Sequence, residues 1–257
     1  YVLYQVNLKP LSANAALLDG LRPEILNEKG KAVAQTPQQQ FENVKKSYEM
    51  NVMTNTEPLE QLAQKAVALL SSNASPEVKS SAFMYVSEAF QKEFARSPKD
   101  PRPRYFYVTL LNQLGMYDQA LKEADALVAL SPNKQSFLAM KTVIEMQLKK
   151  NAEAYETASR SYNLEPRNEE AKRFYVASLI LVGKASEAEA FATTTEARVK
   201  YLQDGAVLNA YINTNQIQRA IALIKKEITT NPNNIDLRSA LINLYIRMKD
   251  TSGAIRE

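Results

Sequence analysis

Residues 105–133, YFYVTLLNQLGMYDQALKEADALVALSPN, form the first copy of the repeat that decides the fold. A second copy follows at residues 137–168, FLAMKTVIEMQLKKNAEAYETASRSYNLEPRN, and a third at residues 171–192, AKRFYVASLILVGKASEAEAFA. Each copy holds two amphipathic segments separated by a short turn. Because one such unit cannot bury its apolar face alone, successive copies are expected to stack into a helical solenoid.

The period of the repeat is 34 residues, and it is marked by an alanine in the second segment and by a later proline: Ala120, Ala154, Ala188, Pro132 and Pro166. The alanine lets two helices cross closely, because it carries no branched side chain. The proline ends the second helix, because it cannot continue the hydrogen-bond ladder. This pattern resembles the tetratricopeptide repeat (TPR) family. The resemblance implies an all-α, right-handed solenoid of antiparallel helix pairs.

The repeat continues toward the C-terminus with one change of length. Ala220 follows Ala188 by 32 residues, so the fourth copy is two residues short, and residues 193–200, TTTEARVK, are expected to be irregular. Ala254 restores the period, and the sequence stops at Glu257, partway through the second helix of a fifth copy. An array without its last helix would expose an apolar end, which favours a fragment or an abbreviated cap.

Three regions are predicted along the chain. Residues 1–56 are an irregular helical region, residues 57–100 a degenerate TPR-like helix pair, and residues 101–257 a TPR array, which makes about five repeats. The proline-rich joint SPKDPRPR, residues 97–104, is interpreted as a stiff turn between repeats, with a domain linker as the alternative.

The first region is predicted to open with a short helix over residues 10–21. The apolar spacing places Leu11, Ala15 and Leu18 on its inward face. Residues 22–36 contain a proline and a glycine, and they are expected to hold at most one turn of helix.

Capping residues place the next helix starts. Thr36 is predicted to cap a helix that begins at Pro37, because its side chain accepts a hydrogen bond from the first turn and proline fits the first helical position. Ser75 is predicted to cap a helix that ends near Arg96 in the same way. Between them, residues 57–70 carry the apolar spacing of another helix.

The composition excludes several kinds of chemistry. The chain has no cysteine and no histidine, which removes disulfides, thiolate nucleophiles, histidine bases and the usual zinc ligand sets. Its 32 basic and 28 acidic residues make a mixed surface, so no nucleic-acid partner is expected. No apolar run is long enough to span a bilayer. We therefore expect no enzyme, no cofactor and no metal in this chain.

The TPR resemblance implies that the first helix of each repeat lines a concave face. At the corresponding positions, the candidate partner-binding residues are Arg102, Tyr105, Thr109, Asn112, Gln113, Arg173, Asn209, Asn213, Asn243 and Arg247. The other residues at the corresponding positions are Ser136, Ala139, Val143, Met146, Gln147, Glu170, Ala177, Ile180, Leu181, Leu202, Gly205, Ile212, Asp236, Ser239 and Ile246.

Two asparagines on this face, Asn209 and Asn243, stand one repeat apart at the same position. An amide both donates and accepts hydrogen bonds, so stacked asparagines suit an extended peptide backbone. The alternative is a solvated inner surface. The two-carboxylate clamp of some TPR co-chaperones needs lysine, asparagine and arginine at set positions. Here one of those positions holds Tyr105, Ala139 and Arg173 in successive copies, so that clamp is not assembled.

A second resemblance covers most of the chain. It is to the C-terminal TPR tail of bacterial O-antigen ligase/polymerase-like membrane proteins, and it implies a membrane-tethered protein of the cell envelope with the side of the membrane left open. The membrane-embedded, glycan-transferring part would lie outside this sequence, so no catalytic residue is transferred. The segments that carry the resemblance are VNLKPLSANAALLDGL (6–21), FENVKKSYEMN (41–51), EPLEQLAQ (57–64), LSPNKQSF (130–137) and LEPRNEEAK (164–172).

Two functions follow from these patterns. The first is a non-catalytic protein-protein interaction scaffold, as an accessory TPR domain of such a cell-envelope polysaccharide protein. The alternative is a free-standing peptide-binding TPR adaptor or assembly factor. Both predict a protein or peptide partner, and both leave the oligomeric state open.

Overall fold

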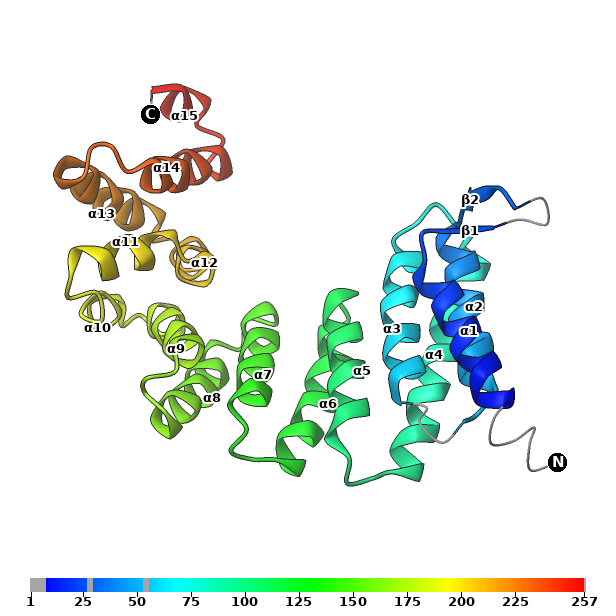
Figure 1. Cartoon of the computed structure of the whole chain (residues 1–257). Coiled ribbons are helices and arrows are strands. Elements are labelled where there is room, and N and C mark those ends of the chain that lie inside the picture. The colour runs from blue at the N-terminus through cyan, green and yellow to red at the C-terminus, as the bar shows by residue number, and fades with distance from the viewer. Residues whose placement is uncertain (1–7, 27–29, 53–55, 257) are drawn as a thin grey trace. The chain divides into compact units, whose positions relative to one another are not determined.

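The computed structural model describes residues 8–26, 30–52 and 56–256 (Figure 1). These residues hold fifteen helices and two short strands, so the all-α prediction is confirmed. No described helix has the length and apolar character needed to cross a membrane. The chain forms two compact units, Tyr1–Ser131 (unit 1) and Pro132–Glu257 (unit 2), each of which is described by itself.

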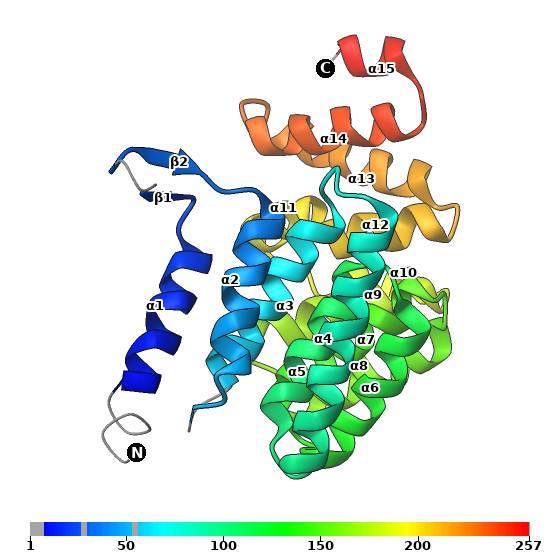
Figure 2. The ribbon, with the colours of Figure 1, turned by 90° about the vertical axis from the view of Figure 1, so that its right-hand side faces the viewer.

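Unit 1 is a row of antiparallel helices in which α1 packs on α2, α2 on α3, α3 on both α4 and α5, and α5 on α6. A small hairpin connects α1 to α2 (Figure 2). The elements are α1 (Lys9–Leu21), β1 (Glu24–Leu26), β2 (Ala32–Ala34), α2 (Pro37–Glu49), α3 (Thr56–Leu70), α4 (Pro76–Arg96), α5 (Pro101–Gln113) and α6 (Tyr117–Leu130).

The predicted caps in unit 1 are confirmed. The Thr36 hydroxyl accepts a hydrogen bond from the Gln39 amide at 3.2 Å, and the Gln39 side chain accepts one from the Thr36 amide at 2.9 Å. Pro37 follows in the first helical position, and Ser75 caps α4 by accepting from the Val78 amide. These bonds satisfy amides that the first turn leaves without helical partners, which fixes where each helix starts.

The predicted inward face of α1 is wrong. Leu11 and Leu18 are 66% and 51% exposed, and Ala15 is exposed as well. The opposite side, with its smaller residues, packs on α2. Gly20 shows why, because a Cβ atom there would lie 2.9 Å from the Gln40 carbonyl oxygen. Close approach of the two backbones therefore decided the face, and the buried set is Ala13, Ala16, Leu17 and Gly20.

The segment between α1 and α2 contains two strands, where the sequence indicated at most a turn of helix. β1 and β2 pair antiparallel, with Ile25 opposite Val33. The Gln35 side-chain amide donates to the Asp19 carbonyl oxygen at 2.6 Å and to the Arg22 carbonyl oxygen at 2.8 Å. Strands of three residues give too short an alternation to be recognised in sequence, and this hairpin is held to α1 by a side chain.

Unit 2 continues the alternation of first helices (A) and second helices (B) of the repeats. The A helices α7 and α9 are neighbours, α9 also packs on α12, and α13 packs on α14. The elements are α7 (Gln135–Gln147), α8 (Asn151–Leu164), α9 (Glu169–Leu181), α10 (Ala185–Glu189), α11 (Thr195–Gln203), α12 (Gly205–Asn213), α13 (Ile217–Thr230), α14 (Ile235–Arg247) and α15 (Thr251–Arg256).

The alanines that mark the period lie at close helix crossings, as predicted: Ala120, Ala154, Ala188 and Ala220 are all 0% exposed. The turn between helix A and helix B also repeats. One residue there has a positive φ in each copy, namely Gly115, Lys149, Gly183, Asn215 and Lys249. The spacing within this set is 34 residues except from Gly183 to Asn215, where it is 32. The turn positions therefore show the same two-residue shortening before the fourth copy as the alanines do.

Candidate partner-binding surface

The ten candidate residues fall into two sets of five, one on each unit. In unit 1 they all lie on α5. In unit 2 they lie on α9, α12 and α14, the A helices of three successive copies. The two sets are therefore two separate surfaces and are taken in turn.

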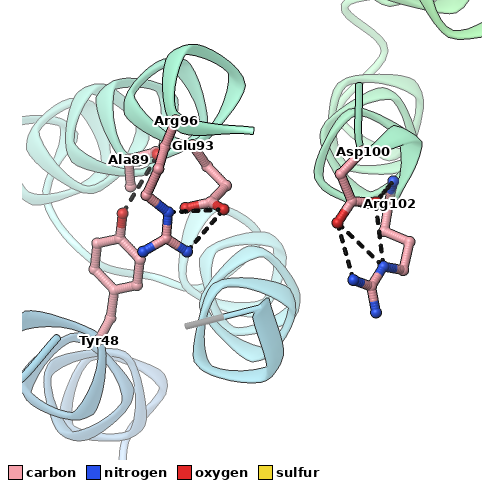
Figure 3. A network of polar contacts seen from close by, with 6 residues as sticks. All are labelled: Tyr48, Ala89, Glu93, Arg96, Asp100 and Arg102. Carbon is pink, nitrogen blue, oxygen red and sulfur yellow. Dashed lines mark hydrogen bonds and ion pairs between the residues drawn. The ribbon is translucent and has the colours of Figure 1, made fainter. Parts of the chain in front are cut away.

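In unit 1, Arg102 is held by a neighbour. Its guanidinium donates to both carboxylate oxygens of Asp100, from Nη2 to Oδ2 at 2.9 Å and from Nε to Oδ1 at 3.2 Å (Figure 3). The same carboxylate caps α5 by accepting from the Arg102 amide at 3.0 Å. This contact holds the pKa of Asp100 below its usual value. Arg102 thus reinforces a helix start, and a ligand would have to compete with that bond.

The remaining α5 candidates are only partly open. Tyr105, Thr109 and Asn112 are half-buried, and Gln113 is exposed. The Thr109 hydroxyl donates to the Tyr105 carbonyl oxygen at 2.9 Å. Most polar groups of this set are therefore covered or used inside the helix, so α5 offers a weak surface for a partner.

Polar contacts on the neighbouring helix α4 also stabilise the fold and are not available to a ligand. Glu93 on α4 is 5% exposed and accepts from Arg96 Nη2 at 2.9 Å, while the Tyr48 hydroxyl donates to the Ala89 carbonyl oxygen at 3.4 Å (Figure 3). Burial, and then the Glu93 charge, raises the pKa of Tyr48. This phenol stays protonated and ties α2 to α4.

The unit 2 set is more open, and the structure brings two of its members together. Arg247 Nη1 on α14 donates to Asn209 Oδ1 on α12 at 2.6 Å. Both side chains are exposed, as are Asn213 and Asn243. We call the exposed row formed by Asn209, Asn213, Asn243 and Arg247 the amide row. The amide hydrogens of Asn209 are left for another acceptor, because its oxygen is the atom that Arg247 occupies.

Several apolar positions assigned to the concave face are buried instead. They belong to the buried apolar core of unit 2 and do not line a surface. The corrected positions are Ala139, Ala177, Ile180, Leu181 and Leu202.

The copy that starts at α9 departs from the others. Its helix B, α10, has 5 residues, whereas α8 and α13 each have 14. The chain then forms the additional helix α11 and breaks at Asp204, whose carboxylate caps α12 by accepting from the Ala206 and Val207 amides at 2.9 and 3.1 Å. We call residues 169–203 the interrupted copy and residues 135–164, with α7 and α8, the regular copy.

A pocket of about 320 Å³ opens between α9 and α11 in the interrupted copy. Arg173 is the one candidate residue on its rim, where its Nε lies 3.7 Å from Asp204 Oδ2. The sequence signal was the two-residue deletion, which marks irregular geometry but does not indicate a cavity. The lining is Glu169, Glu170, Lys172, Arg173, Val176, Phe191, Ala192, Ala197, Lys200, Tyr201, Asp204 and Val207.

A partly buried network of hydrogen bonds holds the interrupted copy in place. The hydroxyls of Tyr201 and Tyr211 lie 2.7 Å apart, and Tyr211 donates to Glu189 Oε1 at 2.7 Å. Arg219 Nε donates to the same carboxylate oxygen at 2.6 Å. Burial raises the pKa of both phenols, so each stays protonated and able to donate. Four elements, α10 to α13, are joined by this network.

The described residues contain no group of acidic side chains placed to hold a metal ion. What the unit 2 surface offers is exposed amides, a guanidinium and a pocket. Such groups suit recognition of a polypeptide segment.

Comparison with known proteins identifies the fold. The sequence matches no protein-family model and no curated protein. The structure is similar to a tetratricopeptide repeat protein from Parabacteroides merdae ATCC 43184, with a TM-score of 0.58 and 13% identity over 96% of this chain and 90% of that one. Pseudomonas aeruginosa PilF gives a TM-score of 0.49 with 13% identity, over 91% of this chain and 98% of that one. A thermophilic TPR protein from Thermus thermophilus gives 0.44 with 18% identity, over 78% and 99%.

The first of these similarities agrees with the 34-residue repeat. The chain has an all-α fold of the TPR type, built from antiparallel helix pairs.

Proposed function

We propose that this chain is a non-catalytic interaction scaffold that binds an extended segment of a partner protein along the amide row of unit 2. The observation that supports it most is the hydrogen bond between Arg247 and Asn209, which links two successive A helices at an exposed position. It orients the Asn209 amide before any partner arrives, and orientation in advance lowers the entropy cost of binding.

The chemistry of the row suits a peptide backbone. Each peptide unit presents one donor and one acceptor, and an asparagine side chain matches both. Asn243 repeats Asn209 one copy later, so the row offers amides at the repeat spacing. Side chains that reach from two A helices can therefore hold an extended segment at two places.

A display selection tests this function. Twelve-residue peptides, which reach about 40 Å when extended, are selected on the full chain, and their affinities are measured by fluorescence anisotropy. The double variant Asn209→Ala/Asn243→Ala should weaken binding by about tenfold, because two hydrogen bonds are lost. Asn163→Ala, at an exposed position on α8, is the control and should leave the affinity unchanged. Unchanged binding in the double variant would contradict the proposal.

A finer proposal places this scaffold in the bacterial cell envelope, as the accessory domain of an O-antigen ligase-like membrane protein. The sequence resemblance motivates it, and so does the open apolar face at α1, where Leu8 directly before the helix and Leu11 and Leu18 within it are 54%, 66% and 51% exposed. Three leucines on one open face are consistent with a membrane or protein neighbour at this end of unit 1. The free-standing adaptor is the alternative.

The coding sequence upstream of Tyr1 decides between the two. The accessory-domain proposal predicts a series of hydrophobic segments encoded in frame before this chain. An upstream stop codon or a soluble domain would support the free-standing adaptor.

A further inference from the structure

We propose that the pocket between α9 and α11 binds one large, uncharged apolar side chain of the partner segment, such as leucine, methionine or phenylalanine. This inference rests on the proposed scaffold function and deepens it by naming the residue class that the partner must supply. Four features of the pocket support it: its origin, its floor, its rim and its position beside the amide row.

The origin of the pocket is the short helix α10. In the regular copy, α8 has 14 residues and packs against α7. In the interrupted copy, α10 ends after 5 residues, and α11 returns at a different place. The space that a full helix B would occupy beside the start of α9 is left as a cavity.

The floor of the pocket is apolar and firmly held. Phe191 packs edge-on against Tyr162 and Tyr175, with ring centroids 5.7 and 5.8 Å away. Tyr201 is 9% exposed, and its hydroxyl is engaged with Tyr211. A floor fixed from behind does not collapse into the space, so the pocket is ready for a ligand. Its other apolar members are Val176, Ala192, Ala197 and Val207.

The rim carries as many acidic as basic residues: Glu169, Glu170 and Asp204 against Lys172, Arg173 and Lys200. Most of these charges are paired within the rim. Lys200 Nζ lies 2.8 Å from Glu169 Oε2, Lys172 Nζ lies 3.9 Å from Glu169 Oε1, and Arg173 pairs with Asp204. A charged ligand would compete with these pairs for their partners, whereas an uncharged one leaves them intact.

The size of the pocket matches a side chain. At about 320 Å³ it lies at the lower end of the range for ligand sites, which is enough for one bulky side chain and its backbone. The floor presents apolar side chains and the Tyr201 hydroxyl, which is already bonded to Tyr211, so it suits an apolar side chain better than a sugar or a nucleotide. A buried apolar anchor is also the kind of contact that dominates affinity in protein interfaces.

The position of the pocket links it to the amide row. Helix α12 contributes Val207 to the pocket and Asn209 to the row, on different faces of the helix because the two residues are two positions apart. Arg173 belongs to the rim and to the predicted concave face. A segment that continues from the row over α12 toward Arg173 can therefore reach the rim of the pocket, because α9 and α12 pack together, and it can place one side chain inside.

The direct test uses capped amino acids as probes of the full chain, followed by NMR. N-acetyl-leucine amide and N-acetyl-phenylalanine amide should shift the Ala192 and Ala197 methyl signals. N-acetyl-lysine amide and N-acetyl-aspartate amide should bind at least about fivefold more weakly. Equal shifts with the charged probes, or no shift at these two alanines, would overturn the proposal.

A variant that fills the pocket with an additional side chain provides the second test. Ala197→Phe places a ring in the cavity and should weaken the selected peptides by about tenfold or more. Ala222→Phe, at an exposed position on α13, is the control for adding a phenylalanine to the surface of unit 2. Circular dichroism confirms that each variant keeps its helices.

The two proposals fail in different ways. Peptides that depend on Asn209 and Asn243 but are unaffected by Ala197→Phe would overturn the anchor and leave the scaffold function standing. Capped phenylalanine that shifts the pocket methyls, in a chain that selects no peptide, would support the apolar pocket and contradict the scaffold function.

Discussion

The regular copy and the interrupted copy start from the same repeat and reach different structures. In the regular copy, a full helix B packs on its helix A, and Ala154 lies at the crossing with no exposure. In the interrupted copy, Ala188 occupies the same position, but α10 ends one residue later at Glu189. The alanine therefore fixes where the two helices cross, and it does not fix how long helix B continues. The shortened helix leaves the space that becomes the pocket.

The largest difference in stability between the two copies is expected when the alanine at the helix crossing is enlarged. Ala154→Leu should destabilise the chain by about 3 kcal/mol, because the long helix α8 cannot move away from α7. Ala188→Leu should cost about 1 kcal/mol, since α10 has only five residues and less structure must shift to admit the larger side chain. Urea unfolding of both variants measures the difference. Equal losses would show that α10 is packed as rigidly as α8.

Removing one hydroxyl tests what holds the interrupted copy. Tyr211→Phe leaves the Tyr201 hydroxyl without its partner and takes one bond from Glu189, which should cost about 2 kcal/mol. The control in the regular copy is Tyr162→Phe, whose ring is held by stacking on Tyr175 at 4.8 Å and should lose little. Urea unfolding reports both, and a Tyr211→Phe loss no larger than that of the control would argue against the network.

Substitutions at the turn between helix A and helix B should change the stability of the chain in opposite directions in the two copies. Lys149 and Gly183 occupy the same left-handed position, with φ of 58° and 81°. Gly183→Ala should destabilise by about 1 kcal/mol, because a Cβ atom is strained there. Lys149→Gly should stabilise by about 0.5 kcal/mol, since it relieves that strain at some cost in chain entropy. Thermal unfolding checks the signs, and the same sign in both variants would contradict this reading of the turn.

The smallest effect concerns the charged rim. The hydrogen bond from Lys200, and then the Lys172 charge, holds the pKa of Glu169 below its usual value. A carboxyl group whose pKa is lower in the folded state than in the unfolded state stabilises the fold at any pH above its unfolded-state pKa. This stabilisation is lost as the pH falls through its folded-state pKa. Lys200→Gln should therefore move the Glu169 pKa toward the ordinary value for glutamate, as measured by carbon NMR titration. Lys226→Gln, at an exposed position on α13, should leave the Glu169 pKa unchanged. If the Glu169 pKa does not move in Lys200→Gln either, the ion pair between Lys200 and Glu169 is excluded.

The periodic features of the fold could be predicted from the sequence, because they depend on local chemistry. Ala120 and Ala154 mark crossings, and Thr36 and Ser75 mark helix starts through bonds to residues three positions away. The face of α1 could not be predicted, because Leu11 and Leu18 fit helical spacing while Gly20 permits a closer approach on the other side.

The candidate site also has one part that could be predicted from the sequence and one part that could not. Asn209 and Arg247 were predicted from their place in the repeat, and the structure joins them across two helices. The pocket was not predicted, because Val176, Ala197 and Val207 come from three elements whose arrangement depends on where α10 ends. The domain limits at residues 56 and 100 remain a prediction.

The most direct test is an NMR titration of the full chain with a selected peptide, with the shifted residues mapped on unit 2. If a partner segment lies on the amide row with its anchor in the pocket, the largest shifts will fall on Ala197, Val207, Asn209 and Asn243. Shifts confined to the B helices α8 and α13, or to α5 of unit 1, would contradict this account.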